Sequence, residues 1–110
     1  MSLRVADRLR RTHGIDARVT DLRWLAPLPI EDIMREARAT GRVLVADETR
    51  RSGGVGQAVL AALIENGYQG DVVRVASDDS FIPLGDAALH VLLQESAIEK
   101  SALALCRPNP

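Results

Sequence analysis

Apolar positions that recur every three to four residues predict four helices in this chain. In the first helix, Leu3, Ala6 and Leu9 would form the apolar face. Gly14 follows the first pattern and Gly41 follows the second, at the position where glycine commonly ends a helix. The expected helices cover about residues 3–13, Pro29 to Gly41, Val55 to Gly67, and about residues 96–106.

Stretches of β-branched and other apolar residues predict three strands between these helices. Ala17–Trp24 alternates apolar with polar side chains, a pattern typical of a strand. Val43–Glu48 is a continuous apolar run that ends on two acids, as expected of a buried parallel strand with a polar carboxyl end. The third strand lies within Asp71–Ser77, and loops are expected at Thr49–Gly54 and Asp78–Ala88.

The alternation of helices with strands predicts an α/β fold. Parallel strands joined by right-handed crossovers place helices on both faces of the sheet, which gives three αβα layers within a single domain, residues 1–110. Chains of this class normally begin with a strand. This sequence instead begins with the helix that should follow one.

Composition narrows the function classes. Of the 110 residues, 46% are hydrophobic and 3% aromatic, so the core consists of aliphatic side chains. The net charge of -1 argues against a general nucleic-acid binder. The sequence has neither an apolar run long enough to span a membrane nor a secretory signal, so we expect no membrane partner and a cytoplasmic location. A single cysteine, Cys106, excludes an internal disulfide and a cysteine metal cluster.

The glycine-rich stretch from Asp47 to Gly56 is the main candidate site, because ligands of open α/β sheets bind where a strand ends and a helix begins. Two interpretations remain open. The stretch either binds an anion or nucleotide at Gly53–Gly56, or forms a tight turn against which another chain or domain packs. Its candidate residues are Asp47, Glu48, Arg50, Arg51, Gly53, Gly54 and Gly56.

Catalytic and metal-binding residues are not expected. Asp47 and Glu48 are adjacent in a strand, so their side chains point to opposite faces and do not form an acid–base pair. His13 and His90 lack further ligands at metal-binding spacing. The apolar residues of the 81–85 loop, which include Phe81 and Pro83, are instead expected to make contacts with another surface.

Three segments carry a resemblance to a known family. Val19–Ile33 (VTDLRWLAPLPIEDI) resembles a "DLR-x-L-x-PLD" motif, and Val43–Val59 (VLVADETRRSGGVGQAV) resembles the strand and glycine loop that come after it. These motifs are similar to those of the C-terminal domain of transketolase-like thiamine diphosphate enzymes, above all the beta subunit, or fused beta region, of the 2-oxo acid dehydrogenase decarboxylating component. Asp79–Leu84 resembles both this subunit and deoxyxylulose phosphate synthases. Two residues depart from the family pattern: Asp47 replaces a common histidine and Pro29 replaces an aspartate.

The resemblance implies a fold and a role. The family's catalytic and cofactor-binding residues lie in other domains, so this chain is expected to bind no cofactor itself. The parent enzyme would use thiamine diphosphate and magnesium. This chain would then be a fragment that supplies interfaces to other domains or subunits of a homo- or hetero-oligomer, and to the acyltransferase core. The alternatives are a stand-alone anion- or nucleotide-binding module, or a fragment of a deoxyxylulose phosphate synthase or transketolase.

The resemblance also predicts a structural gap. In the family, a central strand lies between those that match Ala17–Trp24 and Val43–Glu48, and it precedes the first helix; neither it nor an earlier edge strand is found here. Unpaired buried backbone groups cost about 1–3 kcal/mol each. We therefore expect marginal stability and self-association of the isolated chain.

Overall fold

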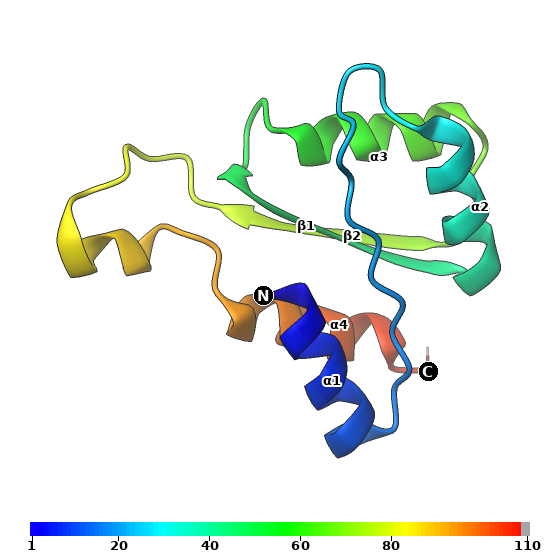
Figure 1. The fold of residues 1–110 in the computed structure, drawn as a ribbon, viewed down its shortest axis with the longest axis horizontal. Helices are drawn as coiled ribbons and strands as arrows, with labels where there is room; N and C mark the ends of the chain where they lie inside the picture. Colours follow the sequence, from blue (N-terminus) through cyan, green and yellow to red (C-terminus); the bar gives the residue numbers. More distant parts are fainter. Residues whose placement is uncertain (109–110) are drawn as a thin grey trace.

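The computed structural model describes residues 1–108, which fold into helices on both faces of a small sheet (Figure 1). The α-helices are α1 (Ser2–His13), α2 (Ile30–Thr40), α3 (Val55–Glu65) and α4 (Glu95–Cys106). The strands are β1 (Arg42–Arg50) and β2 (Asp71–Ser77), and a 3-10 helix, η1, covers Gly85–His90.

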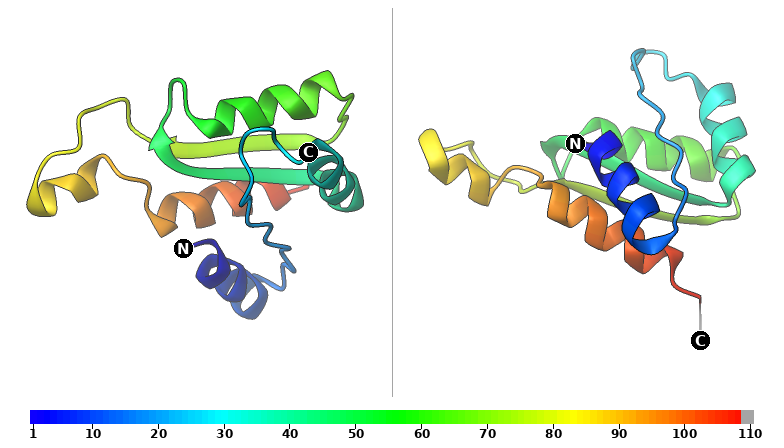
Figure 2. Two further views of the ribbon diagram at one scale, coloured as in Figure 1. Left: turned by 45° about the horizontal axis from the view of Figure 1, so that its top comes forward. Right: turned by 60° about the horizontal axis from the view of Figure 1, so that its bottom comes forward.

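The two strands are parallel, and α3 is the crossover helix between them. Their register runs from Arg42 opposite Asp71 to Asp47 opposite Ala76, with an irregularity before Arg50 pairs with Ser77. Helices α2 and α3 lie on one face of the sheet, and α1 and α4 lie on the other (Figures 1 and 2). The predicted three-layer α/β architecture is thus confirmed.

Each face of the sheet has its own apolar core. The first core joins α2 to α3 through Ile33, Met34, Ala37, Val59 and Leu63. The second joins α1 to α4 and consists of Val5, Leu9, Leu93 and Ile98. The apolar face predicted for the first helix is partly wrong, because Leu3 is 73% exposed while Val5 and Leu9, four residues apart, are buried. Residues four apart lie on one side of a helix, so this pair sets the buried face.

Glycines end the first two helices as predicted. Gly14 has φ 66° and Gly41 has φ 72°, both in the left-handed region, and their N–H groups donate to carbonyls of the preceding turn. Such a conformation is costly for a residue with a Cβ atom, which explains why the sequence alone located both ends.

Ion pairs fasten α1 to α4. The Arg8 guanidinium donates to Glu95 at 2.9 Å and to Glu99 at 3.1 Å, and Arg4 also binds Glu95. These hydrogen bonds raise the pKa of Arg8, and those from Arg8 and Arg4 lower the pKa of Glu95. Two helices far apart in sequence are therefore joined by charge as well as by the apolar core.

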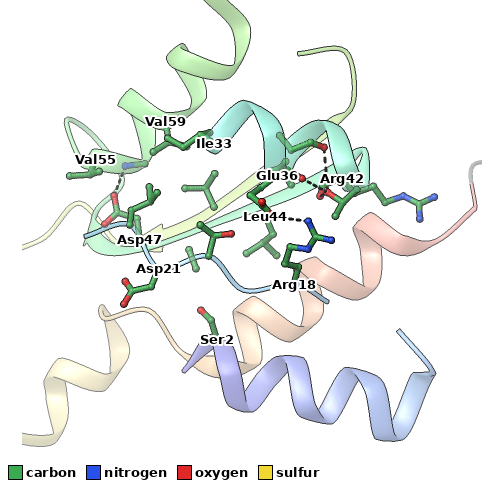
Figure 3. Close-up of a pocket in the computed structure, with 18 of the residues that line it drawn as sticks. Ser2, Arg18, Asp21, Ile33, Glu36, Arg42, Leu44, Asp47, Val55 and Val59 are labelled. Atoms are coloured by element: carbon green, nitrogen blue, oxygen red, sulfur yellow. Dashed lines mark hydrogen bonds and ion pairs between the residues drawn. The ribbon is translucent and has the colours of Figure 1, made fainter. Parts of the chain in front are cut away.

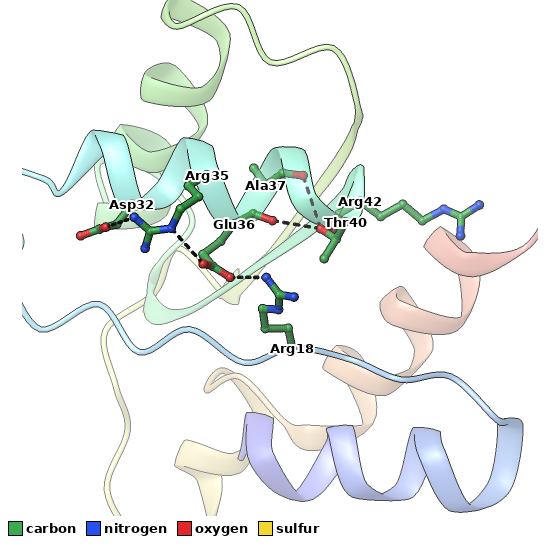
Figure 4. A network of polar contacts seen from close by, with 7 residues as sticks. All are labelled: Arg18, Asp32, Arg35, Glu36, Ala37, Thr40 and Arg42. Atoms are coloured by element: carbon green, nitrogen blue, oxygen red, sulfur yellow. Dashed lines mark hydrogen bonds and ion pairs between the residues drawn. The ribbon is translucent and has the colours of Figure 1, made fainter.

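The strand predicted at Ala17–Trp24 is wrong. Residues 14–29 contain neither helix nor strand and pass from the layer of α1 to that of α2 along the open side of β1 (Figure 1). Side chains fasten this segment: Arg18 donates to Glu36 of α2 at 2.6 Å, and Glu36 also binds Arg35, which binds Asp32 (Figure 4). A β-strand requires backbone partners, and no strand of the described residues forms backbone hydrogen bonds with this segment.

Smaller differences concern the ends of elements. The strand predicted at Val43–Glu48 extends to Arg50, so Thr49 and Arg50 belong to β1 and not to the following loop. The loop predicted at Asp78–Ala88 runs into η1. The last helix begins at Glu95, one residue earlier than expected.

The side of β1 that faces away from β2 has no strand partner among the described residues. Val43, Leu44 and Val45 lie between two helical layers, yet each is only half-buried. Two cavities, of about 480 and 510 Å³, run along β1 and include residues of the 14–25 segment in their walls. The gap expected from the sequence is therefore a groove in the structure.

Candidate functional site

The predicted glycine-rich site lies where the carboxyl end of β1 leads into the first turn of α3. Asp47 and Glu48 stand near the end of the strand, and Gly54 precedes the first residue of the helix. The structure thus places the predicted loop at the sheet edge where α/β proteins bind ligands.

Asp47 organises this loop through its carboxylate. One oxygen accepts hydrogen bonds from the N–H and the hydroxyl of Thr49, at 3.0 and 2.8 Å, and the other accepts from the Gly56 N–H at 2.6 Å. Burial alone would raise the pKa of the Asp47 carboxyl, but the hydrogen bonds from Gly56 and Thr49, with the charge of Arg74, outweigh it and lower that pKa. An ionised Asp47 therefore caps α3 from inside the protein.

Asp79, in the loop that follows β2, binds Ser52 of the glycine loop. Its carboxylate accepts from the Ser52 N–H at 2.7 Å and from the Ser52 hydroxyl at 2.5 Å. These hydrogen bonds lower the pKa of Asp79; burial acts against them, and the charges of Arg51 and Arg50 act with them. Sequence reasoning did not predict this role, although Asp79 opens the segment that resembles the family.

Three backbone N–H groups of the loop donate to side chains of the same chain. Ser52 donates to Asp79, Gly53 donates to Gln57 at 2.7 Å, and Gly56 donates to Asp47. A bound anion would need such donors free. The arrangement therefore favours a self-supported turn over an anion-binding loop.

Gly54 and Gly56 are needed because of close approach and not because of φ. A Cβ atom at Gly54 would meet the Thr49 hydroxyl and lie 2.7 Å from the Arg50 carbonyl oxygen. At Gly56 it would lie 2.8 Å from Cδ of Arg74. Arg74 was not among the predicted residues, and its Nη1 atom is buried without a hydrogen-bond partner in the described part of the chain.

The other charged residues of the site have exposed side chains. The side chain of Glu48 is exposed and, unlike that of Asp47, forms no hydrogen bond within residues 1–108. Arg50 is also exposed, and it donates to the carbonyl of Ser52 at 3.0 Å; Arg51 is exposed. No group of three potential metal ligands occurs among the described residues.

Phe81 and Pro83 lie on an arm, residues 78–92, that projects from the body of the molecule (yellow and orange in Figure 2). Phe81 is 98% exposed and Leu84 is 95% exposed. The hydrogen bonds of Asp79 to Ser52 connect the base of this arm to the glycine loop. The structure thus brings the two predicted regions to the same end of the sheet but does not pack Phe81 against the glycines.

Each helix in the described region falls short of the length and apolarity that a membrane span requires.

Comparison with known proteins gives a consistent result. The family described as "Transketolase, C-terminal domain" matches residues 1–101. A 1-deoxy-D-xylulose-5-phosphate synthase of Gloeobacter violaceus is 43% identical over 70 residues, 64% of this chain and 11% of that protein. The pyruvate dehydrogenase E1 component subunit beta of Bacillus subtilis is 35% identical over 89 residues, 78% of this chain and 27% of that protein. The chain thus spans about a tenth to a quarter of these relatives.

Proposed function

The chain belongs to the transketolase C-terminal domain family, and from this premise we propose that it serves as the C-terminal domain of a thiamine diphosphate-dependent enzyme. The match over residues 1–101 is the observation that carries the proposal. In this role the chain contributes contacts between domains or subunits and leaves the chemistry to other parts of the enzyme.

The side chains of this chain that could bind magnesium support this role. Magnesium that accompanies a diphosphate is usually held by only one or two protein carboxylates together with phosphate oxygens and water, so the carboxylates to consider are those at the glycine loop. The carboxylates at the glycine loop already accept hydrogen bonds from Gly56, Thr49 and Ser52. Thiamine diphosphate and magnesium would therefore be held elsewhere in the assembled enzyme, and we derive no catalytic step for this chain.

For the reaction of the whole enzyme, we place oxidative decarboxylation of a 2-oxo acid first. The supporting observation is the likeness to a pyruvate dehydrogenase subunit over 78% of this chain. Deoxyxylulose phosphate synthesis is the second candidate, favoured by 43% identity over the shorter match.

The exposed apolar arm is the surface that we assign to assembly. Phe81 and Leu84 are almost fully exposed, and such side chains commonly mark contacts with other proteins. The occupant would be another domain or subunit of the same enzyme. In the dehydrogenase case, the acyltransferase core is a further candidate partner.

A chimera experiment tests the proposal. The region that matches this chain is replaced by residues 1–108 in the B. subtilis pyruvate dehydrogenase beta subunit, and separately in the G. violaceus synthase. We expect at least one chimera to assemble, as measured by size-exclusion chromatography, and to retain its host's activity. The preferred host distinguishes the two reactions.

The isolated chain provides the control. With thiamine diphosphate and magnesium added, it should show no turnover of pyruvate or other 2-oxo acids. Turnover by the chain alone, or failure of both chimeras to assemble, would contradict the proposed role.

A further inference from the structure

The outer part of the arm, residues 79–87, has no buried side chain that could fix its direction (Figure 2). Each of these residues is exposed, and the side chains of Phe81 and Leu84 face water almost completely. A segment with so few buried contacts moves locally unless hydrogen bonds hold it. The direction of the arm therefore depends on polar contacts at its base.

The two ends of the arm are joined to each other and to the sheet. The Asp78 N–H donates to a backbone carbonyl at the far end of the arm, at 2.8 Å. The hydroxyl of Ser77, which is buried, donates to the carbonyl of Glu48 at 2.6 Å and accepts from the Leu93 N–H at 2.9 Å. These contacts fix where the arm begins and ends, but they do not reach its outer part.

One contact joins the outer part of the arm to the body of the molecule. The Asp79 carboxylate accepts two hydrogen bonds from Ser52 of the glycine loop, one from the N–H and one from the hydroxyl. Within residues 1–108, the outer part forms no other hydrogen bond to a segment outside the arm. The charges of Arg50 and Arg51 favour the ionised carboxylate that accepts these bonds. Asp79 is therefore the residue through which the body can set the direction of the arm.

The glycine loop holds Ser52 in a fixed position. Arg50 donates to the Ser52 carbonyl at 3.0 Å, and the N–H of the next residue, Gly53, donates to Gln57 of α3 at 2.7 Å. The Asp47 carboxylate fastens the loop to the first turn of α3 (Figure 3). The position of Ser52, and with it that of Asp79, is thus determined by the end of β1 and the start of α3.

We propose that the glycine loop, through the contact of Ser52 with Asp79, sets the direction of the arm and pre-organises it for docking. Ser52 and Asp79 act as positioning residues, because they hold the segment whose apolar side chains, Phe81 and Leu84, meet the partner. An arm held in one direction loses less conformational freedom on binding, so the partner binds more tightly. The inference rests on the proposed function, in which the arm docks on an apolar surface of another domain or subunit of the enzyme.

The direction of the arm is measurable in the isolated chain. Spin labels at Asp86→Cys on the arm and Ala61→Cys on α3, both exposed positions, report the distance between arm and body by pulsed electron paramagnetic resonance. Cys106→Ser removes the native thiol. We expect a narrow distance distribution in this labelled chain and a wider one when Asp79→Ala is added. Asp78→Ala is the matched control and should leave the distribution narrow, because the glycine loop binds Asp79 and not its neighbour.

A double-variant cycle separates this contact from a general loss of structure. Ser52→Ala removes the hydroxyl but keeps the N–H, so it should widen the distribution less than Asp79→Ala does. Added to Asp79→Ala, it should widen the distribution no further, since the shared acceptor is already absent. The unfolding midpoint should stay close to that of the wild type, because both residues are exposed. Residues that merely supported the fold would lower the midpoint instead.

The effect on docking is measured in the chimera that assembles with the wild-type residues 1–108. Asp79→Ala should weaken its assembly about tenfold in sedimentation at a series of concentrations, whereas Asp78→Ala should leave the assembly unchanged.

Three results distinguish the failures. Equal distance distributions in the wild type and Asp79→Ala would overturn the positioning role, whether or not a chimera assembles. A wider distribution with unchanged assembly would overturn the role in docking. Failure of both chimeras with the wild-type sequence would contradict the proposed function, while the isolated chain would still decide whether the glycine loop sets the arm.

Discussion

At the scale of single residues, Asp47 is the side chain that holds the glycine loop. Removal of its carboxylate in Asp47→Ala leaves the N–H groups of Gly56 and Thr49 without their acceptor. We expect a loss of about 1 kcal/mol in the free energy of unfolding, since water partly replaces these hydrogen bonds at a half-buried site. Urea unfolding measures it. Glu48→Ala is the matched control, and an equal loss there would contradict the assignment.

The lowered pKa of Asp47 predicts that the free energy of unfolding depends on pH. The folded protein holds the pKa of Asp47 below its usual value, so its contribution to stability is present above the unfolded pKa, about 4, and is lost as the pH falls through the folded pKa. The stability difference between the wild type and Asp47→Ala should therefore shrink in acid. A constant difference from pH 7 to pH 3 would show that ionisation of Asp47 is not the cause.

The two close-packed glycines should differ in their tolerance of a methyl group. In Gly54→Ala the new Cβ atom meets the backbone carbonyl of Arg50, which cannot move without the strand. In Gly56→Ala the nearest atom belongs to the flexible side chain of Arg74. We expect Gly54→Ala to lower the free energy of unfolding by about 1–3 kcal/mol and Gly56→Ala by less. Urea unfolding of both variants gives the order, and the reverse order would disprove this explanation.

At the scale of elements, the segment Ala17–Trp24 tests the fold most directly. Among the described residues it lacks strand partners, so its amides should exchange with solvent rapidly, whereas those of β2 that pair with β1 should be protected. Hydrogen exchange followed by mass spectrometry compares the two. Protection of Ala17–Trp24 equal to that of β2 would show that the segment pairs as a strand in solution.

At the scale of the whole molecule, the projecting arm should govern self-association of the isolated chain. Phe81 and Leu84 present apolar side chains to water, so we expect the chain to associate as its concentration rises. The double variant Phe81→Ser and Leu84→Ser should reduce association in sedimentation velocity without changing the unfolding midpoint, because neither side chain is buried. Unchanged association would show that the contact does not involve the arm. The open edge of β1 would then be the next surface to test.

The family of the chain and most of its elements could be predicted from local sequence features. Gly14 and Gly41 mark helix ends because a left-handed residue is costly for any side chain with a Cβ atom. The apolar run after Arg42 was sufficient to locate β1, and the glycine loop was placed correctly at its carboxyl end. These features depend on a few neighbouring residues, so the order of amino acids alone determined them.

The tertiary structure decided the features that depend on partners distant in sequence. Ala17–Trp24 has the alternation of a strand, but a strand forms only beside another backbone, and the groove separates this segment from β1. Asp79 reaches Ser52, and Arg8 reaches Glu95, across many residues of chain. No local pattern encodes such contacts, because only the packing of the layers brings their atoms together.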